Sequence, residues 1–192
     1  MMNRCVDIIH LISEEEVIDS TLVQMKARWS EVSFENTPYK ITGTEDEVPV
    51  LSIPQEEIQK LESDKACIRD MLKSQFPTNE LHKEVMSWHE GFLSMSQSYE
   101  LLLYIQQLWT HHEPLFRSEE MKSEWPEYAI AEFFSQEEAF KKIINNAWEQ
   151  KSIKTFMLGH GDEIKSDLEN LKNQLDVCKK HLNDFVSEKS ET

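Results

Sequence analysis

The stretch LHKEVMSWHEGFLSMSQSYELLLYIQQLW, residues 81–109, decides the fold of this chain. Its large side chains recur at alternating spacings of four and three residues, at Leu81, Val85, Trp88, Phe92, Met95, Tyr99, Leu102, Gln106 and Trp109. This heptad pattern predicts a helix with one buried face, a rod of roughly 42 Å at ~1.5 Å per residue. The aromatic side chains favour packing against several helices, and the polar Gln106 is expected to fix the register.

We call such a row of residues at heptad spacing a seam. A second seam predicts a helix over residues 162–187, from its apolar positions Ile164, Leu168, Leu171, Leu175, Cys178, Leu182 and Phe185. Two seams of similar length are expected to pair as antiparallel partners within a bundle. Between them, the first seam helix is expected to end at residues 111–114, His-His-Glu-Pro. A short helix capped by Ser118 and stopped by Pro126 follows, then a helix over residues 127–150. A short piece at 153–158 leads to a Gly-His-Gly turn at 159–161.

The N-terminal part combines helical patterns with a strand-like pattern. Residues 3–31 predict an amphipathic helix in which the capping-box pattern of Ser13 and Glu16 permits a break. Residues 32–53 combine alternating β-branched and aromatic side chains with turn formers, which predicts a small β-hairpin with its loop near residues 42–47. Pro54 then opens a helix that runs to about residue 76, and Thr78 is the expected N-cap of the next one.

These elements predict a mainly α fold, an elongated bundle of long antiparallel helices with one hairpin. We divide it into residues 1–76, with the first helix, the hairpin and the following helix, and residues 77–192, the long-helix bundle. Only four glycines and six prolines are present, against usual shares of ~7% and ~5%, which agrees with long helices and few turns.

Composition excludes several classes of function. A formal net charge of −16 opposes binding to nucleic acid or to an acidic membrane surface. The N-terminus lacks a signal-peptide pattern, and no apolar stretch approaches the ~20 residues of a membrane span. The three cysteines have no metal or disulfide spacing, and we expect Cys67 and Cys178 to be core residues. We therefore expect an intracellular, soluble protein.

The sequence contains no recognisable catalytic motif. None of its glycines has the GxxxxGK[ST] spacing of a nucleotide-binding loop, so a P-loop is excluded and no cofactor is expected. His111 and His112 are adjacent, so on a helix they point about 100° apart and do not form a zinc site of the HExxH type. We expect both to be solvated or hydrogen-bonded at a helix end.

A series of short motifs resembles the opening of the dynein heavy chain linker. Ile12-Ser13-Glu14 leads to Met25-Lys-Ala-Arg-Trp29, then Phe34, Pro38-Tyr39-Lys40 and Thr42-Gly43-Thr44. Farther along come Glu57-Ile58, Met71-xx-Ser74-x-Phe76 and Val85-xx-Trp88. The resemblance is strongest at Gln106-xx-Trp109, Glu113-Pro114-Leu115-Phe116 and Ser118-Glu119-Glu120-Met121. It extends over residues 8–189, and the Pro-Tyr-Lys and Thr-Gly-Thr motifs look more axonemal than cytoplasmic.

The resemblance implies a function. In dyneins the linker is a non-catalytic lever that bends and straightens over a ring of AAA+ modules, as part of an ATP-driven microtubule motor of cilia. It implies as partners the rest of a heavy chain, its ring and other dynein subunits, without direct microtubule contact. It also implies a location in the cytoplasm, the cytoskeleton and the ciliary axoneme. The rigid core of this lever is expected to contain Trp29, Phe34, Tyr39, Trp88, Phe92, Gln106, Trp109, Pro114, Phe116 and Trp148.

The sequence also departs from the family pattern. Gly159-His160-Gly161 stands in place of a Pro-Gly turn, and Glu188-Lys189-Ser190 in place of Lys-Arg. A fragment, a short isoform and a degenerate relative therefore remain open. The alternative function is a stand-alone helical scaffold that binds a partner helix through its seams, and an enzyme of another type is the least favoured reading.

Overall fold

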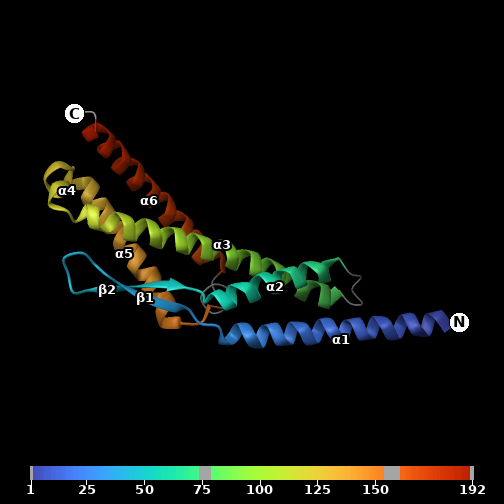
Figure 1. Cartoon of the computed structure of the whole chain (residues 1–192). Helices are drawn as coiled ribbons and strands as arrows, with labels where there is room; N and C mark the ends of the chain where they lie inside the picture. The colour runs from blue at the N-terminus through green and yellow to red at the C-terminus, as the bar shows by residue number, and fades with distance from the viewer. Residues whose placement is uncertain (1, 74–78, 154–160, 191–192) are drawn as a thin grey trace.

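A computed structural model describes residues 2–73, 79–153 and 161–190 (Figure 1). Its elements are α1 (Met2–Glu31), β1 (Glu35–Lys40), β2 (Glu47–Ser52), α2 (Gln55–Leu72), α3 (Asn79–Phe116), α4 (Glu119–Glu124), α5 (Glu127–Gln150) and α6 (Gly161–Ser190). The prediction of a mainly α fold with one small hairpin between residues 32 and 53 is thereby confirmed. The expected N-cap Thr78 and the turn residues Gly159 and His160 lie outside the described residues.

The helix α3 is the axis of the molecule. It runs beside α2 at one end, and at the other end the short α4 reverses the chain, so that α5 crosses back past α3 and α6 then runs beside α3 (Figure 1). The predicted cap of α4 is confirmed, because the Ser118 side chain accepts a hydrogen bond from the Met121 amide. The predicted bounds of α5 agree with the structure as well.

The predicted antiparallel pairing of the two seam helices is wrong. Gln97 of α3 contacts Lys165 of α6, and Tyr104, farther along α3, contacts Asp176, farther along α6. The two helices therefore run in the same direction. The reason is connectivity: α5 lies between them in the chain and runs antiparallel to both, so its two neighbours must be parallel to each other.

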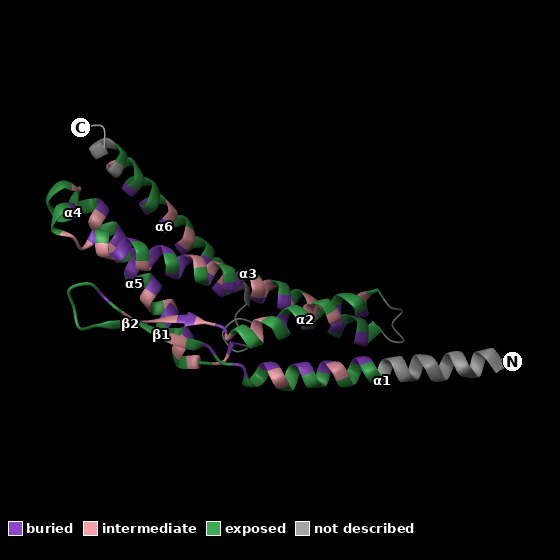
Figure 2. Ribbon diagram, in the orientation of Figure 1, coloured by how far each residue is buried: buried purple, intermediate pink, exposed green. Residues whose placement is uncertain are grey.

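The buried face of α3 is wider than one seam. Every predicted seam position is buried except the half-buried Trp88. Ser98, Ile105, Leu108 and His112, which lie outside that seam, are buried as well, and buried positions occur along much of α3 (Figure 2). A central helix covered on two sides needs apolar or paired residues around most of its circumference, because each neighbour requires its own stripe.

The hairpin pairs β1 with β2 in antiparallel register, with Pro38 opposite Pro49. Proline has no N–H group, so this pair fits a position where neither residue donates to its neighbour. Each proline also removes an outward N–H that a further strand could use, which protects both edges. Gly43 turns the chain at the tip with φ of 78°, a left-handed conformation that glycine adopts without steric cost.

Three predicted helix boundaries differ from the structure. The α1 backbone is continuous across Ser13, so the permitted break does not occur. The α2 helix ends at Leu72, before the predicted residue 76. The α3 helix does not end at residues 111–114 but continues to Phe116, with Pro114 inside it. Pro114 cannot donate to the carbonyl of Thr110. This carbonyl lies 3.4 Å from the Tyr39 hydroxyl, whose one hydrogen is shared with the nearer Glu113 carboxylate at 2.6 Å.

Candidate functional site

No group of three or more His, Cys, Asp or Glu side chains within residues 2–73, 79–153 and 161–190 could hold a metal ion. Over the same ranges no helix has the length and apolar character needed to cross a membrane. Cys67 is half-buried and Cys178 is buried, and both are free thiols whose pKa is raised by burial, for Cys178 to about 11. These thiols therefore stay protonated near neutral pH.

The expectation that His111 and His112 are both solvated or hydrogen-bonded at a helix end is wrong for His112. Only 2% of His112 is exposed, and its Nδ1 atom has no hydrogen-bond partner among the described residues. Burial, assisted by the positive potential of His111 and Lys179, lowers the pKa of His112 to about 4. The ring is therefore a neutral core group that packs near Phe116.

The most distinctive site is the contact between the hairpin tip and α3. The Glu113 carboxylate is completely buried and accepts three hydrogen bonds from the hairpin. The Tyr39 hydroxyl donates at 2.6 Å, the Thr42 amide at 2.8 Å and the Thr42 hydroxyl at 3.1 Å. Burial and then the bond to Glu113 raise the pKa of Tyr39 to about 12, so the phenol remains a donor. We call this contact the tip junction.

A second buried carboxylate lies next to the tip junction. Glu137 of α5 is 3% exposed, and each of its oxygens is 2.8 Å from Nη2 of Arg117. The Trp109 indole N–H donates to it at 3.3 Å, and the Lys141 ammonium lies 3.7 Å away. Burial raises the pKa of Glu137 in spite of these positive neighbours, which act in the opposite direction.

The other end of the hairpin is held by α3 side chains, and we call this contact the strand junction. The Leu51 amide donates to Oε1 of Gln106 at 2.7 Å, and Nε2 of Gln106 donates to the Leu51 carbonyl at 2.8 Å. The Ile53 amide donates to the Tyr99 hydroxyl at 3.0 Å. Because Leu51 and Ile53 are buried, these bonds satisfy backbone groups that would otherwise be orphaned.

The helix α1 is attached through Asp64, a buried carboxylate of α2. The Trp29 indole N–H donates to Asp64 at 2.8 Å, and Arg28 forms an ion pair with the same oxygen. The Trp29 ring also meets Phe92 of α3 edge-on at 5.8 Å between ring centroids. Three helices therefore meet at one tryptophan.

The residues expected to form the core fall into two groups. Trp29, Phe34, Phe92, Gln106, Trp109 and Phe116 are buried, whereas Tyr39, Trp88, Pro114 and Trp148 are half-buried. Several of these rings are in contact with one another. Trp109 meets Tyr39 edge-on at 5.4 Å and stacks on Phe140 at 4.8 Å between ring centroids.

Sequence reasoning missed the charged members of the site. In the sequence, Glu113 stands out only as a member of the His-His-Glu cluster and of a family motif, and no motif marks Arg117, Glu137 or Asp64. The Glu113–Arg117 spacing of four residues was a visible signal, since it places both side chains on one helix face. Glu137 and Asp64 gave no such signal, because each stands among polar residues that resemble a solvated helix face.

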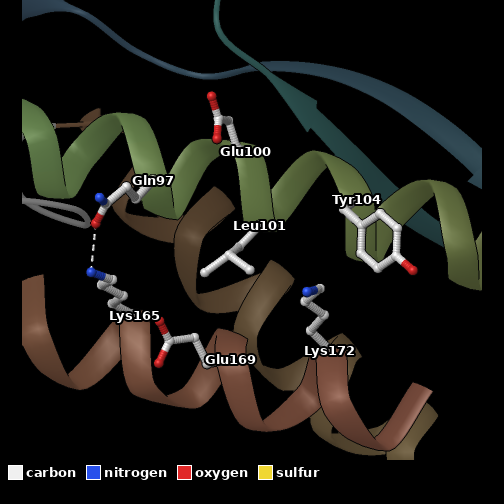
Figure 3. Close-up of a pocket in the computed structure, with 7 residues that line it drawn as sticks. All are labelled: Gln97, Glu100, Leu101, Tyr104, Lys165, Glu169 and Lys172. Carbon is white, nitrogen blue, oxygen red and sulfur yellow. Dashed lines mark hydrogen bonds between the residues drawn. The ribbon is translucent and has the colours of Figure 1, made fainter. Parts of the chain in front are cut away.

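A groove between α3 and α6 is lined by Gln97, Glu100, Leu101, Tyr104, Lys165, Glu169 and Lys172 (Figure 3). Lys165 donates to Gln97 across it, and the Lys172 ammonium lies 5.5 Å from the centroid of the Tyr104 ring. Tyr104 donates to Asp176, which together with burial raises the pKa of this phenol. Glu100 points away from the groove (Figure 3). The side chains here connect the two helices to each other.

Comparison with known proteins decides the family. The model of the family described as dynein heavy chain, N-terminal region 2, matches residues 2–192. The chain belongs to the dynein heavy chain family. This confirms the resemblance read from the short motifs.

Curated dynein heavy chains are similar over nearly the whole chain. The dynein gamma chain of the flagellar outer arm of Chlamydomonas reinhardtii is 27% identical over 179 residues, 92% of this chain. Dynein axonemal heavy chain 1 of Homo sapiens is 24% identical over 182 residues, 95% of this chain. Cytoplasmic dynein 2 heavy chain 1 of Chlamydomonas reinhardtii is 25% identical over 178 residues, 91% of this chain. The chain spans about 4% of the length of each of these relatives.

The motifs that resemble other dynein heavy chains meet in space. The Pro-Tyr-Lys and Thr-Gly-Thr motifs place Tyr39 and Thr42 on the carboxylate of Glu113, which begins the Glu-Pro-Leu-Phe motif. Gln106 and Trp109 of the QxxW motif contact Leu51 and Tyr39 of the hairpin. Segments far apart in the dynein chain are therefore parts of one contact between hairpin and bundle.

Proposed function

We propose that this chain is a non-catalytic linker segment, a lever, of a dynein heavy chain, and that it works in an ATP-driven microtubule motor of the ciliary axoneme. Membership in the family supports the motor context, and most of the relatives found are named as axonemal or flagellar heavy chains. The proposed partners are the AAA+ ring and other dynein subunits. The chain itself contacts no microtubule in this proposal.

The observation that supports a lever is the double attachment of the hairpin to α3. The tip junction at Glu113 and the strand junction at Gln106 both consist of hydrogen bonds to buried groups. A buried hydrogen bond is directional, and breaking it leaves an unsatisfied polar group, so the two parts resist sliding along each other. A lever needs this property, because it transmits force only when its parts move as one body.

Both junctions cross the boundary that we propose between residues 1–76 and residues 77–192. The first region contributes Tyr39, Thr42 and Leu51, and the second contributes Gln106 and Glu113. The contact between Trp29 and Phe92 crosses the same boundary. We infer that the two regions form one stiff arm, and that bending of the lever occurs elsewhere.

A chimeric motor tests this proposal. The aligned segment of the Chlamydomonas outer-arm gamma chain would be replaced by this chain, and both ATP hydrolysis and microtubule gliding velocity would be measured. We expect the chimera to move microtubules. We also expect Gln106→Met in the chimera to lower the gliding velocity more than the rate of ATP hydrolysis, because a lever that deforms transmits less of its movement to the microtubule.

A matched control is Gln107→Met, which changes an exposed neighbour of Gln106 and is expected to leave velocity unchanged. Equal velocities for the two variants would contradict the lever role. So would ATP hydrolysis by the purified 192-residue chain alone. A chimera that fails to move while the isolated chain captures an amphipathic helix would favour the scaffold function instead.

A further inference from the structure

Arg117 lies between two buried carboxylates that belong to different helices. Its Nη2 atom bonds both oxygens of Glu137 on α5, and its Nε atom is 3.5 Å from Oε1 of Glu113 on α3. The guanidinium is also 4.9 Å from the centroid of the Phe134 ring. The side chain is 16% exposed, so its charge interacts with both carboxylates through a poorly solvated environment.

The donors of Arg117 are not all used. A guanidinium has five N–H groups, and Nη1 is buried without a hydrogen-bond partner among the described residues. The Nε contact with Glu113 is longer than an ordinary charge-assisted hydrogen bond. Arg117 therefore has unused donors for a closer pairing with Glu113, and a shift of the guanidinium toward Glu113 would lengthen the Nη2 contacts with Glu137.

The hairpin supplies hydrogen-bond donors to Glu113, and their number determines how strongly this carboxylate attracts Arg117. With the hairpin in place, Tyr39 and Thr42 supply three hydrogen bonds to the Glu113 carboxylate. If one of these donors is lost while the hairpin stays in place, the buried carboxylate has fewer partners, and this favours a closer approach of a cation. Within the described residues, Arg117 is the cation that pairs with Glu113. Glu137 keeps Lys141 at 3.7 Å as a partial substitute.

We propose that Arg117 is a coupling element that links the tip junction to the packing of α5. With all three hairpin donors on Glu113, Arg117 stays on Glu137 and fixes α5 against α3. When one of these donors is lost, Arg117 shifts toward Glu113 and the hold on α5 weakens. The inference concerns this chain as a folded unit and does not depend on the lever function.

A double-mutant cycle on the 192-residue chain tests the coupling. Tyr39→Phe keeps the ring contact with Trp109 but removes a donor to Glu113, and Glu137→Gln removes the charge that holds Arg117. Their effects on the unfolding equilibrium constant, measured in urea, are expected to deviate from a simple product by about fivefold or more. Effects that multiply to within twofold would overturn the proposal.

The matched control is Tyr104→Phe, which also removes a hydroxyl that donates to a carboxylate, Asp176 on α6. Its effect should multiply with that of Glu137→Gln. A second readout is the carboxyl carbon resonance of Glu137, titrated by NMR in each variant. We expect the midpoint to rise in Tyr39→Phe and to stay constant in Tyr104→Phe. An unchanged midpoint in Tyr39→Phe would also overturn the proposal.

Discussion

The side chain of Gln106 makes with Leu51 the two hydrogen bonds that a third β-strand would make. It accepts from the Leu51 amide and donates to the Leu51 carbonyl, at 2.7 and 2.8 Å. A hairpin of two strands is marginal by itself, so this amide ladder explains how a short sheet persists on a helical surface. It also gives the polar member of the α3 seam a specific role.

Gln106→Met should therefore destabilise the chain by roughly 2–4 kcal/mol, because two buried backbone groups lose their partners. The free energy of unfolding from urea denaturation measures this loss. Gln107→Met on the exposed side of the same helix turn is the control and should change stability by less than about 0.5 kcal/mol. A small effect at Gln106 would mean that water reaches Leu51.

Glu113→Gln should cost roughly 3 kcal/mol, since the amide presents a donor to at least one of the hairpin donors and leaves Arg117 with less negative charge. Glu119→Gln serves as the control because its side chain is 93% exposed. Thermal melts of both variants provide the comparison. If both variants had the same melting temperature, the tip junction would not stabilise the fold.

Trp109→Ala is expected to cost about 3–5 kcal/mol, the range for removing a large buried aromatic side chain. Trp109 loses contact with Tyr39, Phe140 and the Glu137 carboxylate at once. Trp88→Ala, at a half-buried position of the same seam, should cost clearly less. Equal losses would contradict the described packing of α3.

The stability of the chain should fall as pH decreases from about 6.5 to about 4, because of His112. Its pKa is lowered to about 4 in the folded chain, so the unfolded chain takes up the proton first and is favoured on acidification. The contribution reaches roughly 3 kcal/mol at 1.36 kcal/mol per pKa unit. It is fully present above pH 6.5 and lost below about pH 4.

His112→Gln should flatten this part of the pH profile, which urea denaturation at several pH values would record. His111→Gln, on the exposed neighbour, should leave the slope unchanged. The same slope in His112→Gln as in the parent chain would show that other groups cause the acid sensitivity.

Lys151→Gly should stabilise the chain by about 0.5–1 kcal/mol. Lys151 has φ of 58° and ψ of −39°, and the Ser152 amide donates across it to the Gln150 carbonyl. This is the strained form of the γ-turn, which glycine adopts more easily. Lys151→Ala keeps the strain and loses the contact with Trp148, so it should not stabilise. A lower melting temperature for Lys151→Gly would argue against the strained turn.

Much of the fold could be predicted because its signals are local. The seam of α3, the Ser118 cap and the hairpin between residues 32 and 53 each depend on residues a few positions apart. The direction of α6 relative to α3 could not be predicted from local signals. It depends on α5, which comes between the two helices in the chain and runs antiparallel to both. The end of α3 could not be predicted because Pro114 normally stops a helix, and the Tyr39 hydroxyl beside the Thr110 carbonyl is far away in sequence.

The candidate site was harder to predict than the fold. Glu137 is flanked by Gln136 and Glu138, and no periodic pattern distinguishes a buried carboxylate from a solvated one. Its burial depends on Arg117, which directly follows the end of α3. The motif resemblance named Tyr39, Thr42 and Glu113, but only the structure brings them into one contact.

The most direct test of a stiff arm is the distance between the hairpin tip and α6 in solution. Spin labels at Glu45 and Val177, both exposed, would be introduced into a chain whose native cysteines are replaced by alanine, and the distance distribution measured by double electron–electron resonance. Our account predicts one narrow distribution. A broad or two-peaked distribution would show that hairpin and bundle move separately, and would contradict it.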